Sequence, residues 1–204
     1  MNNLKIFIYF FHLSMPFAQI QYQDLYFDPK IQEMCVSPSF KCPFYGHSWS
    51  CPPNAPFLKN ALSSYKEFYL IYSKFDLESY IRKEKERTNR SEFYIKNTFL
   101  LTKSFANYDL ENEFTTFLSE HKNHYIKKLL LYDGTCKYCK IQEKGACSFD
   151  DGEPCRFPTE KRYSMEAVGI EVIRTVLDLK KRNKIEIEYP SNKYSYRFGL
   201  ACFK

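Results

Sequence analysis

The sequence predicts an α+β fold: a single compact domain over residues 1–204, with a mixed sheet, packed helices and two cysteine-rich loops. Three observations predict it. Segments with helical periodicity alternate with aromatic and β-branched runs that are typical of strands. The 204 residues are 44% hydrophobic and 26% charged, which is enough apolar material for an ordinary core. Seven of the eight cysteines lie in segments rich in Pro, Gly and Ser, a composition that predicts loops.

Hydrophobic patterning and capping residues predict five features in the first part of the chain. They are a short strand at residues 19–27, a turn or helix start at Asp28-Pro29, a buried strand at 66–72, a helix from 76 to about 90 and a second helix at 109–124. Asp76 is the expected N-cap of the first helix. Leu77, Tyr80 and Ile81 are spaced to form one buried face of it.

The second part of the chain predicts three strands and one helix. They are strands at residues 125–132, 185–189 and 194–203, and a helix that begins after residue 164 and extends beyond residue 176. Ser164 is the expected N-cap of this helix, and Val168, Val172, Val176 and Leu179 recur at helical spacing. Alternation of helices with strands supports the α+β assignment.

The cysteines form two clusters separated by a long stretch without cysteine. The first cluster is Cys35, Cys42 and Cys51 in a loop at residues 35–53, and the second is Cys136, Cys139, Cys147 and Cys155 in a loop at 134–158. Thiolates with two residues between them, as at Cys136 and Cys139, can bind one metal ion or cluster. The sequence therefore predicts metal binding by these seven thiols.

Disulfide bonds are one alternative, because the number of cysteines is even. The short spacing of Cys136 and Cys139 is poor for a structural disulfide and suits a metal or redox pair. Residues 6–11 form an apolar run that could pass for a weak signal peptide, but no small-residue cleavage site follows. A buried first strand, or a true start at Met15, explains this run better. We therefore expect a cytoplasmic, reducing location.

Zinc and iron–sulfur binding are the remaining alternatives. Four thiolates in the second cluster could close a tetrahedral zinc site, but only one CxxC pair is present. A [4Fe–4S] cluster accepts wider spacing, and proline next to Cys42, Cys51 and Cys155 stiffens such loops. The second cluster could ligate a complete [4Fe–4S] site, and the first could leave one iron open. Ligands shared between the two loops are a further alternative.

Three other residues are weighed as contributors to the metal site. Arg156, beside Cys155, can place positive charge near an anionic thiolate cluster and is the predicted cofactor-binding residue. His47 lies between Cys42 and Cys51, but a loop histidine bonded to nearby backbone is the better explanation. Cys202, in the apolar terminal segment, is predicted to be a buried thiol and not a ligand.

Other functional classes find little support in the sequence. The net charge of +6 is small, and the densest charged run, residues 82–87, alternates in sign, which predicts a solvated helix face. We expect no nucleic-acid partner, since such a surface needs basic residues without interleaved acids. No segment has the roughly 20 apolar residues of a membrane span, so no membrane is expected. No nucleotide-binding glycine motif is present.

Several motifs together resemble those of a known family. They are FDPKIQEMC, KCPFYGHSWSCPP, GTCKYC, GEPCRFP and SMEAVGIEV, and they cover the chain from about residue 24 to 203. This combination is similar to an uncharacterised prokaryotic family of predicted metal-binding proteins, with a cysteine-rich domain of unknown function. The resemblance implies that the seven clustered cysteines are the family's metal-binding residues.

The sequence thus predicts a cytoplasmic protein that carries one or two [4Fe–4S] clusters. Electron transfer, or service to a redox protein partner in anaerobic metabolism, is the expected role. A zinc-stabilised interaction module without redox activity, with Zn²⁺ in place of the cluster, is the main alternative. An enzyme that uses an open iron on the first cluster is a third.

Overall fold

The computed structural model describes residues 16–37, 40–102 and 104–204. Its main sheet contains β1 (Phe17–Ile20), β4 (Glu67–Asp76), β5 (Lys128–Tyr132), β6 (Tyr163–Ser164) and β7 (Tyr194–Phe203). The helices are α1 (Lys30–Glu33), α2 (Lys59–Leu62), α3 (Leu77–Thr88), α4 (Glu92–Thr102), α5 (Ser104–Glu120), α6 (Tyr138–Ile141) and α7 (Val172–Lys181). Two 3₁₀ turns, η1 (Tyr22–Asp24) and η2 (Glu166–Val168), and a small hairpin of β2 (Val36–Ser37) and β3 (Phe40–Lys41) complete the elements. The two alternatives for the N-terminal apolar run lie outside the described residues.

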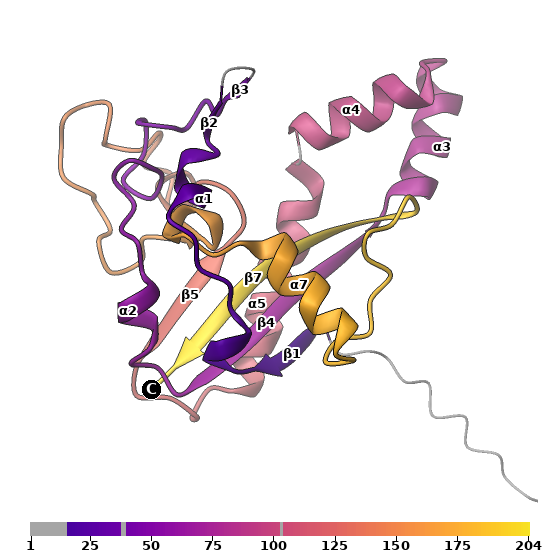
Figure 1. Cartoon of the computed structure of the whole chain (residues 1–204). Helices are drawn as coiled ribbons and strands as arrows, with labels where there is room; N and C mark the ends of the chain where they lie inside the picture. The colour runs from indigo at the N-terminus through magenta and orange to yellow at the C-terminus, as the bar shows by residue number, and fades with distance from the viewer. Residues whose placement is uncertain (1–15, 38–39, 103) are drawn as a thin grey trace, which may run out of the picture.

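The main sheet is mixed, as predicted. Its strand order is β1-β4-β7-β5-β6. The first three neighbouring pairs are antiparallel and the last, β5 with β6, is parallel. The long strands β4 and β7 pair along their whole length and form the centre of the sheet (Figure 1). The α+β class with packed helices and two cysteine-rich loops is therefore confirmed.

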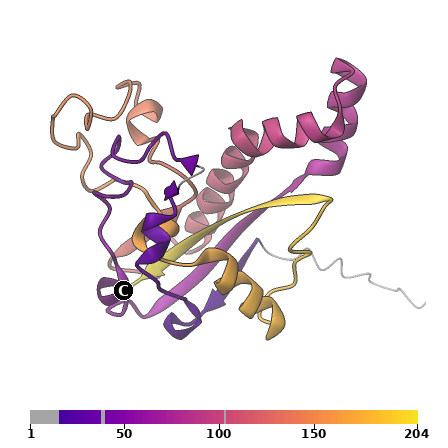
Figure 2. The same ribbon diagram turned by 45° about the horizontal axis from the view of Figure 1, so that its top comes forward.

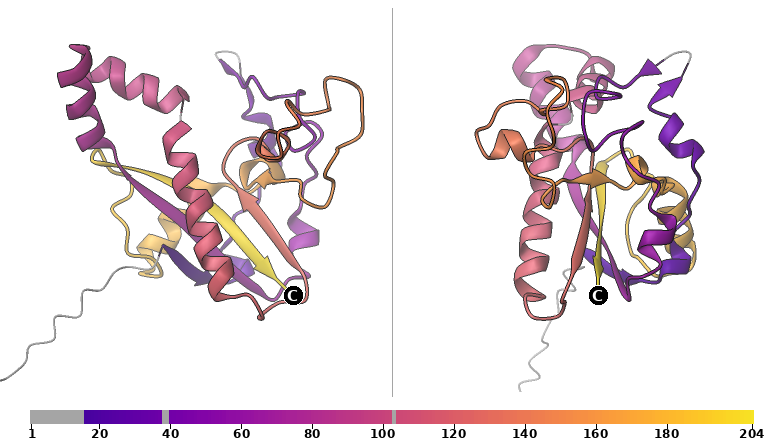
Figure 3. Two further views of the ribbon diagram at one scale, coloured as in Figure 1. Left: turned by 180° about the vertical axis from the view of Figure 1, so that it is seen from behind. Right: turned by 90° about the vertical axis from the view of Figure 1, so that its left-hand side faces the viewer.

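Helices cover both faces of the sheet, and the alternation of residues along the strands explains why. In β4, Leu70 belongs to a core shared with Val176 of α7, whereas its neighbour Ile71 belongs to a core shared with Phe114 and Phe117 of α5. Successive side chains of a strand point to opposite faces, so one strand serves both cores. Figure 3 shows α5 on one side of the sheet and α7 on the other.

Glycine at position 199 lets α5 lie close to the sheet. A Cβ atom added there would lie 2.5 Å from the Phe114 ring and 2.7 Å from the carbonyl oxygen of Leu131. Phe114 itself is 1% exposed. The phenyl ring therefore occupies the space that any larger residue of β7 would need.

Helices α3 and α4 extend beyond the end of the sheet (Figure 2). The predicted cap of α3 is confirmed, because the Asp76 carboxylate accepts a hydrogen bond of 2.9 Å from the backbone N–H of Ser79. The predicted buried face is present too: Leu77 is buried against Phe99 of α4, and Tyr80 and Ile81 pack beside them. Helix α4 was not predicted from the sequence. Its apolar residues do not follow one stripe, and Phe93 is 79% exposed.

Several element boundaries differ from the sequence prediction; for example, β4 continues to Asp76 and β5 begins at Lys128. The first strand ends at Ile20 instead of continuing to residue 27, because the Asp24 carboxylate accepts a hydrogen bond from the Gln21 N–H and forms a 3₁₀ turn. Ser164 caps only η2, since Gly169, with φ of +90°, ends that turn before α7 begins. Helix α5 begins at residue 104, ahead of the predicted 109.

The predicted strand at residues 185–189 is wrong. These residues are not in regular secondary structure. Ile185 is nevertheless buried in the core beneath α7, and the carbonyl of Tyr189 accepts a hydrogen bond from the Lys180 ammonium group. Apolar residues alternate here because an irregular segment packs against the core. The resulting pattern is the same as that of a strand, so the sequence predicted a strand.

Asp24 is a buried carboxylate that supports the fold at η1. It is 3% exposed and bonds to Lys184 at 2.8 Å and to Arg182 at 2.8 Å. Burial alone would raise the pKa of Asp24, but Lys184, the Gln21 N–H and Arg182 together lower it below its usual value of 3.8. This contribution to stability is therefore present above about pH 4 and is lost as the pH falls through the lower folded-state pKa.

We expect Asp24→Asn to destabilise the protein by about 2 kcal/mol at pH 7, a value reduced because both cations are partly exposed. Urea unfolding of both proteins between pH 3 and pH 7 measures this effect. The difference in unfolding free energy should shrink below pH 4, where the wild-type carboxylate begins to take up a proton. A difference that stays constant over this range would contradict the assignment.

Candidate functional site

The two cysteine loops lie side by side at one end of the molecule (Figures 1 and 2). The first loop follows α1 and leads to α2. The second leaves the sheet at the end of β5 and returns to it at β6. Since β5 and β6 are parallel neighbours, the second loop is a crossover whose two ends are held by the sheet. The fold therefore brings together segments that are far apart in the sequence.

The first loop gathers its three cysteines. Hairpin β2–β3 brings two of them opposite each other, with the Cys42 N–H donating a hydrogen bond of 2.8 Å to the Cys35 carbonyl. Burial, together with the nearby negative charges of Cys42, Cys51 and Glu166, raises the pKa of the Cys35 thiol to about 11. The Cys42 thiol is also a hydrogen-bond partner of Cys35, and Cys51 lies near enough to affect the pKa of Cys35, so these three thiols of the first loop are called the thiol cluster below.

A hydrogen-bond network joins this thiol cluster to the second loop. The Ser50 hydroxyl accepts a hydrogen bond of 3.1 Å from the backbone N–H of Cys136. The sulfur of Cys51 lies 3.4 Å from the hydroxyl oxygen of Thr135. Burial raises the pKa of Cys51, while its hydrogen bonds with Thr135, Ser50 and Ser48 act in the opposite direction. The polypeptide at Cys136 is thus attached directly to the polypeptide at Cys51.

A second set of contacts joins the same part of the first loop to the far end of the second. His47 Nδ1 lies 2.9 Å from a carboxylate oxygen of Asp150. The indole N–H of Trp49 donates to the Glu153 carbonyl at 3.1 Å, and its ring meets Phe149 edge-on at 4.9 Å. His47 therefore pairs with a carboxylate and links the loops. This is not the backbone bond expected from the sequence, but it also gives His47 an explanation other than metal ligation.

The remaining three cysteines of the second loop are half-buried. Cys139 lies in the short helix α6, and Cys147 and Cys155 lie in the irregular segment that follows. Arg156 fastens this segment, because its guanidinium donates to the Ala146 carbonyl at 2.8 Å and pairs with Asp151 at 3.3 Å. Its described contacts are therefore to the loop itself, and its role toward a cofactor stays a prediction.

The donors in these loops suit a soft metal centre. Thiols are the ligands that zinc and iron–sulfur clusters prefer. Within the described part of the chain, no three His, Cys, Asp or Glu side chains converge closely enough to hold a metal ion as they stand. The chemistry of the donor set therefore fits a metal, and ligation would draw the thiols together. Cys202 differs from the others: it is fully buried in the core between the sheet and α7, which confirms the prediction of a buried thiol.

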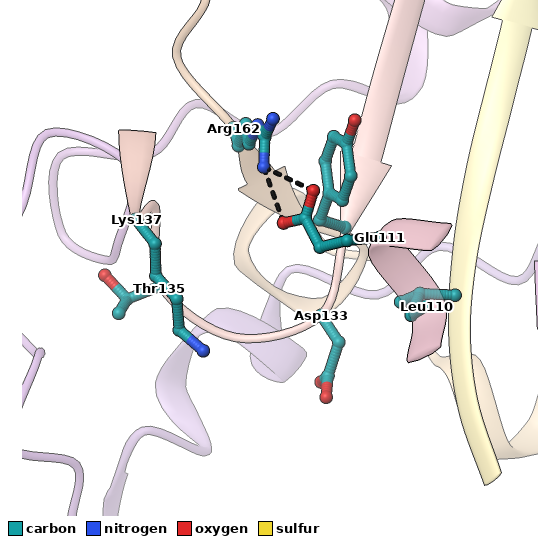
Figure 4. A pocket seen from close by; sticks show the side chains of 7 residues that line it. Leu110, Glu111, Asp133, Thr135, Lys137 and Arg162 are labelled. Carbon is teal, nitrogen blue, oxygen red and sulfur yellow. Dashed lines mark hydrogen bonds and ion pairs between the residues drawn. The ribbon is translucent and has the colours of Figure 1, made fainter. Parts of the chain in front are cut away.

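A small pocket opens beside the joined loops (Figure 4). Its lining residues come from α5, the end of β5, the start of the second loop and the segment before β6; they are Leu110, Glu111, Tyr132, Asp133, Thr135, Lys137 and Arg162. Arg162 binds both carboxylate oxygens of Glu111, and its guanidinium lies 4.4 Å from the centre of the Tyr132 ring. These contacts hold one wall of the pocket in place.

The opposite wall begins with a buried ion pair. Arg197 of β7 is 6% exposed and its Nη1 donates to Asp133 at 3.0 Å. The other two guanidinium nitrogens, Nε and Nη2, are buried without a hydrogen-bond partner among the described residues. Asp133 is the first residue after β5, so this ion pair positions the start of the second cysteine loop. Burial lowers the pKa of the nearby Lys137 and raises that of Tyr132 to about 12.

Sequence reasoning placed the cysteines in the two loops and missed the residues around them. Ser50 and Thr135 each adjoin a predicted ligand, so the flanking hydroxyls were an available signal. Asp133, Thr135 and Lys137 alternate along the chain, which could have indicated a shared wall. Glu111 and Arg162 are 51 residues apart, and nothing local in the sequence connects them.

Comparison with known proteins supplies the family. Neither the curated proteins nor the solved structures gave a match. In the described part of the chain, no helix is both long enough and apolar enough to span a membrane. A family model described as "Predicted metal-binding protein (DUF2284)" matches residues 18–201, which is most of the chain and includes all seven clustered cysteines. The chain therefore belongs to the DUF2284 family of predicted metal-binding proteins.

Proposed function

We propose that the protein holds one or two [4Fe–4S] clusters on its loop cysteines and transfers electrons to or from a partner redox enzyme. One observation supports this most: the thiols of Cys35, Cys42 and Cys51 are gathered in one loop that is bonded to the loop of Cys136. The predicted ligands remain those seven cysteines of the two loops. An iron–sulfur cluster supplies reversible one-electron transfer at a potential that depends on nearby charges and hydrogen bonds.

The contacts between the loops favour one shared metal centre with ligands from both loops. They give less support to two independent centres, one in each loop. Cys51 touches Thr135, and the next residue, Cys136, is bonded through its N–H to Ser50. Cys136 is therefore the cysteine of the second loop that we propose completes the trio of the first loop. Hydroxyl groups at Ser50 and Thr135 can donate hydrogen bonds to a thiolate sulfur, which favours its ionised, metal-binding form. Such support around the ligands is typical of metal centres.

Exposed apolar side chains near the cysteines support the proposal of a protein partner. Met34, Val36 and Phe44 are 67%, 43% and 46% exposed in or beside the first loop, and Ile141 is 51% exposed in the second. Exposed apolar side chains grouped around a site support docking of another protein. Electron transfer needs such close approach. We propose a cytoplasmic location as well, because thiolate ligands require a reducing compartment.

Metal analysis of protein purified without oxygen tests this proposal. We expect about four to eight iron atoms per chain with matching sulfide, and a visible absorption that bleaches on reduction, as [4Fe–4S] clusters give. One or two zinc ions without colour would overturn the iron–sulfur proposal. That result would instead support a zinc-stabilised interaction module, to which the His47 and Trp49 contacts between the loops would contribute.

A further inference from the structure

The pocket of Figure 4 adjoins the thiol cluster through a single residue. Thr135 lines the pocket, and its hydroxyl oxygen lies 3.4 Å from the sulfur of Cys51. Asp133 and Lys137, two residues before and after Thr135 in the same loop, also line the pocket. A molecule in this pocket would therefore lie one side chain away from a predicted metal ligand.

The two carboxylates that line the pocket are each paired with an arginine. Glu111 is occupied by Arg162, which binds both of its carboxylate oxygens. Asp133 is occupied by the buried Arg197, which retains two unpartnered nitrogens among the described residues. Lys137 also lines the pocket, and it forms no ion pair with any residue in the described part of the chain. Since each carboxylate of the lining is already paired with an arginine, the charge of Lys137 is the one left to attract an anion.

The size of the pocket limits what can enter it. The cavity has a volume of about 20 Å³, which is the room that one water molecule needs. One oxygen atom of an anion fits this space, while the rest of the ligand would lie outside. In Figure 4 the side chains of Lys137 and Thr135 extend from the same stretch of loop, and the Lys137 ammonium is the one that can approach such an oxygen, because the Thr135 hydroxyl is turned toward Cys51.

We propose that this pocket binds the oxyanion group of a small ligand, through the Lys137 ammonium, at the edge of the metal centre. This inference rests on the proposed function and adds a ligand class to it. The ion pair of Arg162 with Glu111 fixes one wall of the pocket, and the ion pair of Arg197 with Asp133 fixes the start of the other. Lys137 remains to pair with a carboxylate or phosphate oxygen. Thr135 couples the occupied pocket to Cys51.

Anion binding to the full-length protein tests this proposal. We would titrate wild-type protein with acetate and, separately, with inorganic phosphate, following the binding heat at low ionic strength. The variants are Lys137→Met and, as a matched control, Lys140→Met. Both remove one lysine from the second loop, but only Lys137 lines the pocket. Iron, sulfide and zinc are measured on every sample, and titrations are repeated after metal removal.

We expect saturable binding of one anion per chain, weakened about tenfold or more by Lys137→Met and unchanged by Lys140→Met. A preference for acetate or for phosphate identifies the oxyanion. Equal weakening in both variants, or no saturable binding by the wild type, would overturn the proposal. Metal contents keep the two hypotheses distinct. A protein without iron that still binds anions through Lys137 contradicts the iron–sulfur proposal alone, and an iron-loaded protein that binds none contradicts the pocket alone.

Discussion

Replacing Cys51 with serine is expected to remove about half or more of the bound metal, because a hydroxyl is a poor substitute for a thiolate ligand. Cys51 is the only buried thiol of the first loop, it lies with Cys35 and Cys42, and it touches the second loop at Thr135. No other cysteine combines these contacts within the residues that the structure describes. Iron, sulfide and zinc per chain, measured after anaerobic purification, give the result directly.

The matched control for this variant is Cys202→Ala. Cys202 is equally free of disulfide bonding but is buried in the core, away from both loops. We expect this variant to keep its metal and to lose about 1 kcal/mol of stability through a small cavity. Full metal content in Cys51→Ser would show that Cys51 is not a ligand. Loss of part of the metal indicates two centres, and loss of all of it indicates one shared centre.

Gly199→Ala is expected to destabilise the protein by about 3 kcal/mol, because the added methyl group would overlap the Phe114 ring and the Leu131 carbonyl. The ring belongs to the tightly packed core under α5, and the carbonyl belongs to the neighbouring strand. Neither can move without disturbing the sheet. Chemical denaturation monitored by circular dichroism measures the loss.

Gly152→Ala separates this steric effect from a backbone effect. Gly152 has φ of +71°, but no atom outside its immediate neighbours lies within 4 Å of an added Cβ. Its substitution should cost only about 1 kcal/mol, from the left-handed conformation alone. If both variants lost the same stability, the close packing of α5 on β7 would not be the cause of the Gly199 effect.

Much of this fold is predictable from local sequence, and the exceptions have identifiable causes. Strands β4 and β7 could be predicted from the pattern of hydrophobic residues, and the Asp76 cap from the capping preference of aspartate. Helix α4 escaped prediction because its apolar residues do not define one face. Ser164 was predicted to cap the long helix α7. Its hydroxyl instead accepts a hydrogen bond in the short turn η2, which Gly169 ends before α7 begins.

The candidate site, too, was predictable from the sequence in some parts and not in others. Cysteine is rare and its spacing is informative, so the loops and their expected chemistry could be predicted. Which thiols lie together depends on how the loops meet, and that is determined by contacts such as Ser50 with Cys136. The pocket was beyond sequence reasoning, because Asp133 meets Arg197 across 64 residues through the pairing of β5 with β7.

The attachment of the second cysteine loop to β5 and β6 has a consequence for how the protein matures. The two strands hold the ends of this loop together, and the two main cores contain none of the seven loop cysteines. Nascent chains can therefore complete the sheet before any metal arrives, with the cost of closing the loop already met by strand pairing. Metal insertion then becomes a late step on a folded scaffold, so that lost metal can be replaced without unfolding the chain.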